Sequence, residues 1–479
     1  MACNKVSEDI DTIKYEPEFA IPLITDASVS FIDLWQNDSP GQSLAVQPDG
    51  TLVFRYESDP IEVTTTDILG ALEFPVVSGL PDTLSILPFT LPANIQIEQA
   101  TIAGGFVIFQ FQRIVTEPVN ITFTLPHIKK NGLPVSITTT GTSGSTLSFP
   151  LVGHSFEPDS NALEIRYKAT NINGNPVALS NVGIIARPVL QFVKGTWGRE
   201  EFQLIPDKIA IDLYDERFLN GNLSFSKPTI TAKLESSFGL PIRSRVDIMN
   251  AFTKTKGVMP IDASAIDGVD INYPLLSERG QSKETTLQVD YTNSNIVEVF
   301  DAQLTELEYG LTAIANPDND QDLVVFIEDT STFKAQVKVE VPVIGRAKNF
   351  EAIESFEVPF DDIPTISEGE FKLIVENELP VGAQLQFYFM GGATFIIDSL
   401  FQEIPQLVEA AATDRTGQVT SPAETTTFIP ISAEKMNNIL QADRIQARAI
   451  FQTDNDGDRN VIIKADQQLR FRMGLRFKT

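Results

Sequence analysis

The sequence predicts an all-β protein built of several sandwich-like domains. Apolar and polar residues alternate through much of the chain, and turn-forming residues interrupt the alternation roughly every 8–12 positions. The 29 prolines and 28 glycines are spread along the chain, which disfavours long helices because both residue types weaken a helix interior. Helical periodicity is confined to a few short segments. Together these features predict many short strands and little helix.

The clearest strand signal is a hairpin near the N-terminus. Residues 44–47 and 51–56 alternate on either side of Pro48-Asp49-Gly50, a segment with strong turn chemistry. The same alternation predicts further strands over residues 106–111, 121–125, 323–327, 335–341 and 384–389.

Two segments carry helical signals. Residues 398–412 have helical spacing, although Pro405 interrupts it. Ser432 is a favourable N-cap residue ahead of apolar i, i+3, i+4 spacing in residues 433–440. We expect this second helix to connect a strand over residues 428–431 with a strand over 445–450.

The length of the chain predicts several domains. A chain of 479 residues exceeds one ordinary core, and about 150 residues per domain gives three or four domains. We place the boundaries near residues 112, 205 and 355. We expect each domain to be an immunoglobulin- or fibronectin-III-like sandwich, and the row of domains to be elongated. The division is an acidic tether over residues 1–18, domains over 19–112 and 113–205, a region over 206–355 that could hold two sandwiches, and a domain with one short helix over 356–479.

The charge balance restricts the partners. The chain has 36 basic and 64 acidic residues, a net charge of −28. Such a surface repels phosphate backbones and anionic lipids, so we expect no nucleic-acid partner. It suits solubility, divalent cations or a basic partner. The 32 Phe against 8 Tyr and 2 Trp favour packed cores over a broad aromatic recognition face.

The N-terminal segment contains the single cysteine, Cys3, so the chain has no disulfide framework. A small residue, Ala2, precedes Cys3, and an acidic segment follows at residues 7–11. This arrangement resembles the mature edge of bacterial lipoproteins of the surface-exported type. The resemblance implies that Cys3 is lipidated in a longer precursor and that the protein touches the membrane through its lipid alone. The alternative is an ordinary cysteine on a disordered tail.

A degenerate repeat joins several predicted strands. A turn followed by proline and a β-branched residue recurs at residues 131–135, 173–177, 238–242 and 377–381, with a variant that lacks proline at 293–297. Proline can begin a strand where no ladder donor is needed. The pattern resembles the fibronectin-III-like sandwich of the late-embryogenesis-abundant type. That resemblance implies binding or structural modules and not enzymes.

Two acidic loops between predicted strands carry the sharpest chemical signal. Alternate carboxylates can converge on a hard cation, so calcium is a candidate cofactor. Neither loop is an EF-hand, because Leu323 and Ala465 stand where glycine and glutamate are required. The alternative is a pair of solvated hairpin turns. The candidate ligands are Asp318, Asp320 and Asp322 in the first loop and Asp454, Asp456 and Asp458 in the second.

Aromatic and catalytic signals are few. Trp35 and Trp197 are candidate ligand contacts, because sugar-binding sites stack rings on exposed aromatic faces; burial in a core is the alternative. The two histidines, His127 and His154, lack metal-ligand spacing. Glu157 stands where a nucleophile elbow at Ser155 would need glycine. We therefore expect no catalytic residues and no enzyme.

These observations predict a non-catalytic envelope lipoprotein that acts as a scaffold, an adhesin or an accessory subunit of a cell-surface complex. We expect it at the outer membrane or cell surface, or secreted or periplasmic, with protein partners in the envelope. One alternative is a carbohydrate-binding module protein with a glycan ligand. A second is a glycoside hydrolase, which would need two carboxyls about 5–9 Å apart in a concave site. A third is a filament subunit, which a long, uncharged edge strand would indicate.

Overall fold

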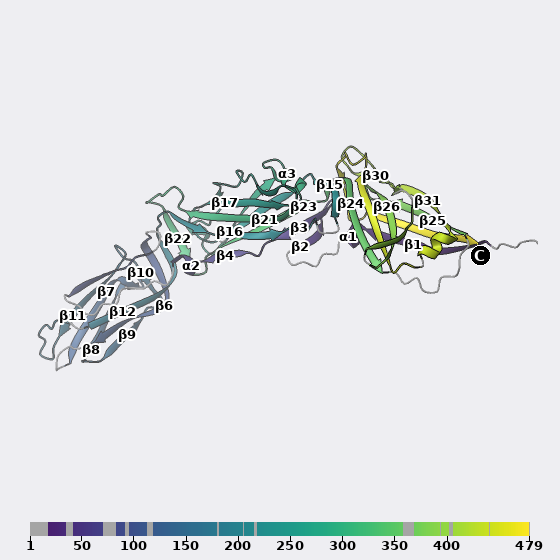
Figure 1. Cartoon of the computed structure of the whole chain (residues 1–479). Coiled ribbons are helices and arrows are strands. Elements are labelled where there is room, and N and C mark those ends of the chain that lie inside the picture. Colours follow the sequence, from purple (N-terminus) through teal and green to yellow (C-terminus); the bar gives the residue numbers. More distant parts are fainter. Residues whose placement is uncertain are drawn as a thin grey trace, which may run out of the picture.

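The chain forms antiparallel sheets that group into three bodies in an elongated row (Figure 1). The structure is a computed structural model. The predicted all-β fold of several sandwiches is confirmed. We call the three bodies distal, central and terminal. The structure describes residues 18–34, 42–69, 83–91, 95–112, 118–179, 182–204, 206–214, 218–357, 368–392, 394–401, 406–439 and 441–478.

The distal body contains most of a nine-stranded sheet that folds into two layers. Strand β10 pairs with both β6 and β7 and so joins the layer β9-β6-β12 to the layer β8-β7-β11-β5. Phe109 of β6 stacks on Phe123 of β7 with ring centroids 4.0 Å apart, at the centre of a separate apolar core. The strands are β5 (Leu84–Pro88), β6 (Gln96–Phe111), β7 (Val119–Lys130), β8 (Leu133–Gly141), β9 (Thr146–Pro150), β10 (His154–Phe156), β11 (Ala162–Thr170) and β12 (Val182–Thr196).

The central body is a sandwich of two six-stranded sheets around the largest core, which includes Trp197, Phe238 and Phe300. The helices are α2 (Thr65–Leu69), the 3-10 helix η2 (Leu276–Glu278) and α3 (Ile296–Asp301). One sheet contains β2 (Gln42–Val46), β3 (Leu52–Glu57), β4 (Ile61–Thr64), β16 (Thr229–Ser236), β20 (Lys283–Asp290) and β23 (Thr332–Pro342). The other contains β13 (Glu200–Gln203), β14 (Asp207–Ala210), β17 (Ile242–Thr253), β18 (Gly257–Pro260), β19 (Asp270–Ile271) and β21 (Leu304–Ala315).

The terminal body contains both ends of the described chain. Its four-stranded sheet has the order β1-β34-β25-β31, so the first strand pairs with the last. The strands of this sheet are β1 (Glu18–Ser30), β25 (Glu368–Asn377), β31 (Ala423–Ser432) and β34 (Gln468–Lys478). A seven-stranded sheet contains β15 (Phe218–Phe225), β24 (Ile344–Glu357), β26 (Val381–Gly391), β27 (Phe395–Ser399), β28 (Gln406–Val408), β32 (Arg444–Thr453) and β33 (Val461–Ile462). The remaining elements are α1 (Phe31–Leu34), the ribbon β29 (Ala412–Thr413) and β30 (Val419–Ser421), and α4 (Ala433–Ile439).

The chain does not pass through the three bodies one after another. It begins in the terminal body with β1, crosses the central body with β2 to β4, and builds the distal body with β5 to β12. It returns through the central body, contributes β15 to the terminal body, completes the central body with β23, and ends in the terminal body.

The sheets therefore do not follow the expected linear division of the chain. β6 and β12 lie on opposite sides of residue 112 and pair along their length. β24 continues across residue 355, and the strands before and after residue 205, β13 and β14, both pair with β21 in the central body. Alternating patterns mark where a strand lies but not which distant strand it pairs with, so a linear division could not anticipate this nesting.

The bodies are joined by backbone pairing. The end of β12 pairs with β22 (Val324–Glu328), which connects the distal sheet to the central body. At the other junction, Leu52 N donates to the carbonyl oxygen of Ile463 at 3.1 Å, and Val343 N donates to that of Leu52 at 2.8 Å. These contacts fix each body against its neighbour.

Several local expectations are confirmed. β2 and β3 form the predicted hairpin, with Gly50 at φ +88° in its turn. Ser432 caps α4, since its Oγ accepts a hydrogen bond from Lys435 N at 3.2 Å. The helix predicted over residues 398–412 is wrong, because the described part of that segment pairs with β26 as β27 and β28. Tertiary pairing outweighs a helical pattern that Pro405 already weakens.

Candidate functional site

The residues of the first acidic loop form hydrogen bonds and an ion pair with other groups of the protein. Asp318 Oδ1 lies 3.1 Å from Nη1 of Arg243. The buried Asn316 amide donates to the carbonyl oxygens of Trp197 at 2.6 Å and Asp320 at 2.9 Å, and its Oδ1 accepts from Asp320 N at 3.0 Å. Asp322 N donates to Asp320 Oδ1 at 2.9 Å. These contacts describe a turn built around Asn316, and they engage two of the three aspartates proposed as ligands.

The second acidic loop is also built into the protein. Asp454 Oδ2 accepts hydrogen bonds from Thr413 Oγ1 at 2.5 Å and from Arg459 Nη1 at 3.2 Å. Burial raises the pKa of Asp454, but its hydrogen bonds outweigh burial and hold that pKa below its usual value of 3.8. Asp458 pairs with Lys348 at 2.8 Å, and Asp456 accepts from Gln452 at 3.3 Å. In the part of the chain that the structure describes, no three His, Cys, Asp or Glu side chains group as a metal site.

Of the two alternatives for Trp197, ligand contact or burial in a core, the structure shows burial, because the side chain is 2% exposed in the core of the central body. A side chain buried between two sheets cannot stack on a ligand at the surface. Its indole Nε1 has no hydrogen-bond partner. Trp35 and Cys3 lie outside the described residues.

The two histidines are held by main-chain contacts in the distal body. His154 is buried, and its Nδ1 lies 3.0 Å from the carbonyl oxygen of Leu151. His127 Nδ1 lies 3.0 Å from the carbonyl oxygen of Glu157, and its Nε2 lies 3.4 Å from Glu164 Oε2. Ser155 donates to Glu157 Oε1 at 2.9 Å and not to a histidine. The geometry brings together no Ser–His pair at this segment.

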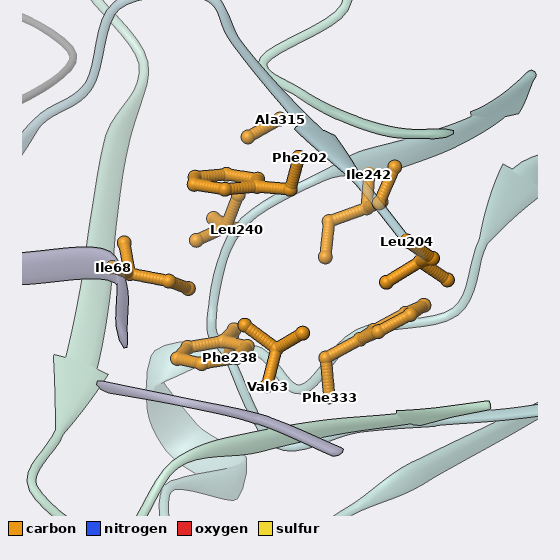
Figure 2. A pocket seen from close by; sticks show the side chains of 10 residues that line it. Val63, Ile68, Phe202, Leu204, Phe238, Leu240, Ile242, Ala315 and Phe333 are labelled. Atoms are coloured by element: carbon orange, nitrogen blue, oxygen red, sulfur yellow. The ribbon is translucent and has the colours of Figure 1, made fainter. Parts of the chain in front are cut away.

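Two cavities in the central body are small. One of about 20 Å³ lies between its two sheets, and Ile68, Phe238 and Phe333 are among the apolar side chains that line it (Figure 2). A second of about 10 Å³ lies beside Tyr309. Since one water needs roughly 10–15 Å³, neither cavity admits a substrate. Among the described residues, no helix is both long enough and apolar enough to cross a membrane.

The distal body carries a surface that the sequence analysis did not single out. On the outer face of β8 and β7, neighbouring side chains are hydroxyls and one amide. The Thr138 and Thr122 hydroxyls lie 3.2 Å apart, and Thr140 Oγ1 donates to Asn120 Oδ1 at 3.1 Å. We call the exposed β8 side chains of this surface the hydroxyl edge. The register partners are Ser136 with Thr124, Thr138 with Thr122, and Thr140 with Asn120, and the hydroxyl edge consists of Ser136, Thr138 and Thr140.

β8 is also an edge strand. It pairs with β7 on one side, and no strand within the described ranges pairs with its other side. Charged side chains usually protect such an edge from pairing with another chain, yet β8 contains none. Pro134 is the only residue of β8 that disfavours such pairing. The whole segment 131–153 lacks Asp, Glu, Lys and Arg in a chain with 21% charged residues. This uncharged run is the signal by which the sequence could have revealed the surface.

Comparisons with known proteins do not assign a function. No family model and no curated protein matches the chain. The chain is similar to a candidate secreted protein from Parabacteroides distasonis at 14% identity, covering 60% of this chain and 89% of that chain, with a TM-score of 0.30. A structure of infectious bursal disease virus, Gx strain, has 8% identity, coverage of 92% and 81%, and a TM-score of 0.15. The CBM22 tandem of Paenibacillus barcinonensis Xyn10C has 10% identity, coverage of 67% and 97%, and a TM-score of 0.14.

Proposed function

We propose that the chain is a non-catalytic binding protein of the bacterial cell envelope that holds its distal body away from the surface to which it is anchored. The observation that carries this proposal is the pairing of β1 with β34, from Glu18 opposite Lys478 to Ser30 opposite Gln468. This pairing lies in the terminal body, at the opposite end of the row from the distal body (Figure 1). An anchor at the N-terminus therefore leaves the distal body at the free end.

The anchor in this proposal is a lipid on Cys3. Residues 4–17 separate Cys3 from β1, and fourteen extended residues reach about 50 Å at most. The backbone-paired junctions suit a stiff spacer, because force or displacement at one end is carried through sheets and not through loops. The partners in this proposal are proteins of the envelope, which the distal body would meet first.

The alternatives have less support. The burial of Trp197 removes one of the two tryptophans on which the carbohydrate-binding alternative depended. The two cavities described above are too small to hold a sugar between two carboxyls.

The proposal is tested by expressing the gene with its native upstream region and measuring the intact mass and detergent partition of the product. We expect a mature chain that begins at Cys3, carries added acyl mass and enters the detergent phase. The matched control, Cys3→Ser, should stay in the aqueous phase. An unmodified wild-type chain in the aqueous phase would refute lipid anchoring.

Orientation is tested separately with an epitope inserted after Gly174, in a turn of the distal body with Gly174 at φ +79°. Antibody should bind this epitope on intact cells. Binding only after the cells are permeabilised would contradict presentation at the cell surface.

A further inference from the structure

We infer that two copies of this chain associate through β8, edge to edge and antiparallel, so that their distal bodies share a continuous sheet. The inference goes beyond the proposed function and does not depend on Cys3 or on anchoring. It is carried by three properties of β8: its unpaired side, its lack of charge and the side chains of the hydroxyl edge.

The unpaired side of β8 presents main-chain donors and acceptors in a regular row. Of the described strands, only β7 pairs with β8, and the residues of β8 make no further backbone hydrogen bonds with the loops that the structure describes. A second extended strand satisfies such a row with regular geometry. β8 is nine residues long, which is longer than most strands in globular proteins. This geometry therefore suits a second β-strand as the binding partner of β8.

The charge of the chain restricts the places where a second copy can bind. At −28, two copies repel each other over most of their surfaces. The segment 131–153 contains no charged residue, so contact through it avoids like-charge repulsion. Arg166 and Lys168 lie on β11, on the far side of β7 from the edge, whereas Lys129 of β7 lies opposite Pro134 at the start of β8 and is paired with Glu157. Homotypic pairing of β8 thus places no two charged side chains of this strand opposite each other.

The side chains of the hydroxyl edge can pair with those of the hydroxyl edge in a second copy. In an antiparallel pair centred on Thr138, this residue lies opposite its own copy, and Ser136 lies opposite Thr140. Cross-strand hydroxyl pairs of this kind stabilise antiparallel sheets. Because the same strand serves on both sides, the contact is two-fold and closes after two copies. It therefore gives a dimer, in contrast to the open filament that an uncharged edge strand suggested from sequence.

The association should be weak in solution. A single strand pair buries a small area, and interfaces of that size support transient complexes. On a surface that carries many copies, the high local concentration of the chain would favour this dimer.

The test is sedimentation velocity over a concentration series of the purified chain. The wild type should show a reversible monomer–dimer equilibrium. Thr138→Asp and Thr138→Lys each place like charges opposite each other in the dimer, so each should weaken dimerisation by about fivefold or more. An equimolar mixture of the two variants should recover dimers, since Asp then faces Lys.

Thr426→Asp is the matched control, because it places the same substitution at an exposed position of β31, an edge strand of the terminal body. It should dimerise as the wild type does. Circular dichroism of all variants should match the wild type, since Thr138 is exposed.

Three outcomes would overturn the inference. The wild type could remain monomeric at the highest soluble concentration. Thr138→Asp could dimerise as well as the wild type, which would place the contact elsewhere. The mixture of variants could fail to recover dimers, which would exclude symmetric pairing about Thr138.

Discussion

At the residue scale, Asn316 explains the first acidic loop. Its side chain is 1% exposed, and it satisfies two carbonyl oxygens and one amide of the surrounding chain. It also adopts φ +44°, a conformation that asparagine tolerates better than most residues. The sequence correctly offered turn chemistry as an alternative to calcium, but it could not show that the turn closes on the carbonyl oxygen of Trp197, 119 positions away.

The importance of Asn316 is tested by comparing Asn316→Ala with Asn319→Ala. Both residues have positive φ, at 44° and 53°, so the backbone strain introduced by alanine is matched. Only Asn316 is buried, and its loss leaves buried main-chain groups without partners. We expect Asn316→Ala to lower the free energy of unfolding by about 1–3 kcal/mol more than Asn319→Ala. Urea denaturation measures the difference, and equal losses would contradict this role.

At the element scale, β10 joins the two layers of the distal body with the help of one ion pair. Lys129 Nζ of β7 lies 2.5 Å from Glu157 Oε2, at the end of β10. The hydrogen bond from Lys129, with a further one from Ser155, holds the pKa of Glu157 below its usual value of 4.5. A carboxyl whose folded pKa is lowered stabilises the fold above its unfolded pKa, and that contribution is lost as the pH falls through its folded pKa.

The contribution of Glu157 should therefore depend on pH. Glu157→Gln should destabilise the protein at pH 7, and the difference from the wild type should shrink as the pH falls below about 4.5. Glu62→Gln is the control, since Glu62 forms an exposed pair with Lys334 at 3.6 Å, and such pairs contribute little. Denaturation at several pH values measures the effect, and a difference that stays constant with pH would count against it.

Also at the element scale, the sequence predicted several strands but not their partners. The alternation over residues 335–341 correctly marks β23, which pairs with β3 so that Arg55 lies opposite Glu340, 285 positions away. The sequence analysis also did not predict that β8 is an edge strand, because an edge strand is defined by the absence of a neighbouring strand in space.

At the scale of the whole molecule, the nesting of the bodies determines which fragments can fold. The distal body is built from one continuous stretch with its own apolar core, separate from that of the central body. The central and terminal bodies each draw strands from several parts of the chain.

A fragment of residues 83–196 should therefore fold alone, with a cooperative thermal transition and the circular dichroism of a β protein. Residues 206–355 form the comparison fragment, because a linear division treats them as a domain. They lack β2 to β4 of the central body and carry β15, whose partner sheet lies in the terminal body, so this fragment should not unfold cooperatively. The reverse pattern would contradict the nested architecture.

The sequence by itself determined the fold class, the positions of many strands, the hairpin at Gly50 and the cap of α4 at Ser432. Each of these depends on the alternation and turn chemistry of residues close together in the chain. The tertiary structure alone decided that β1 pairs with β34, that the distal body is an insertion, that Trp197 is buried and that β8 is left at an edge. These depend on contacts between residues far apart in sequence, which local patterns do not encode.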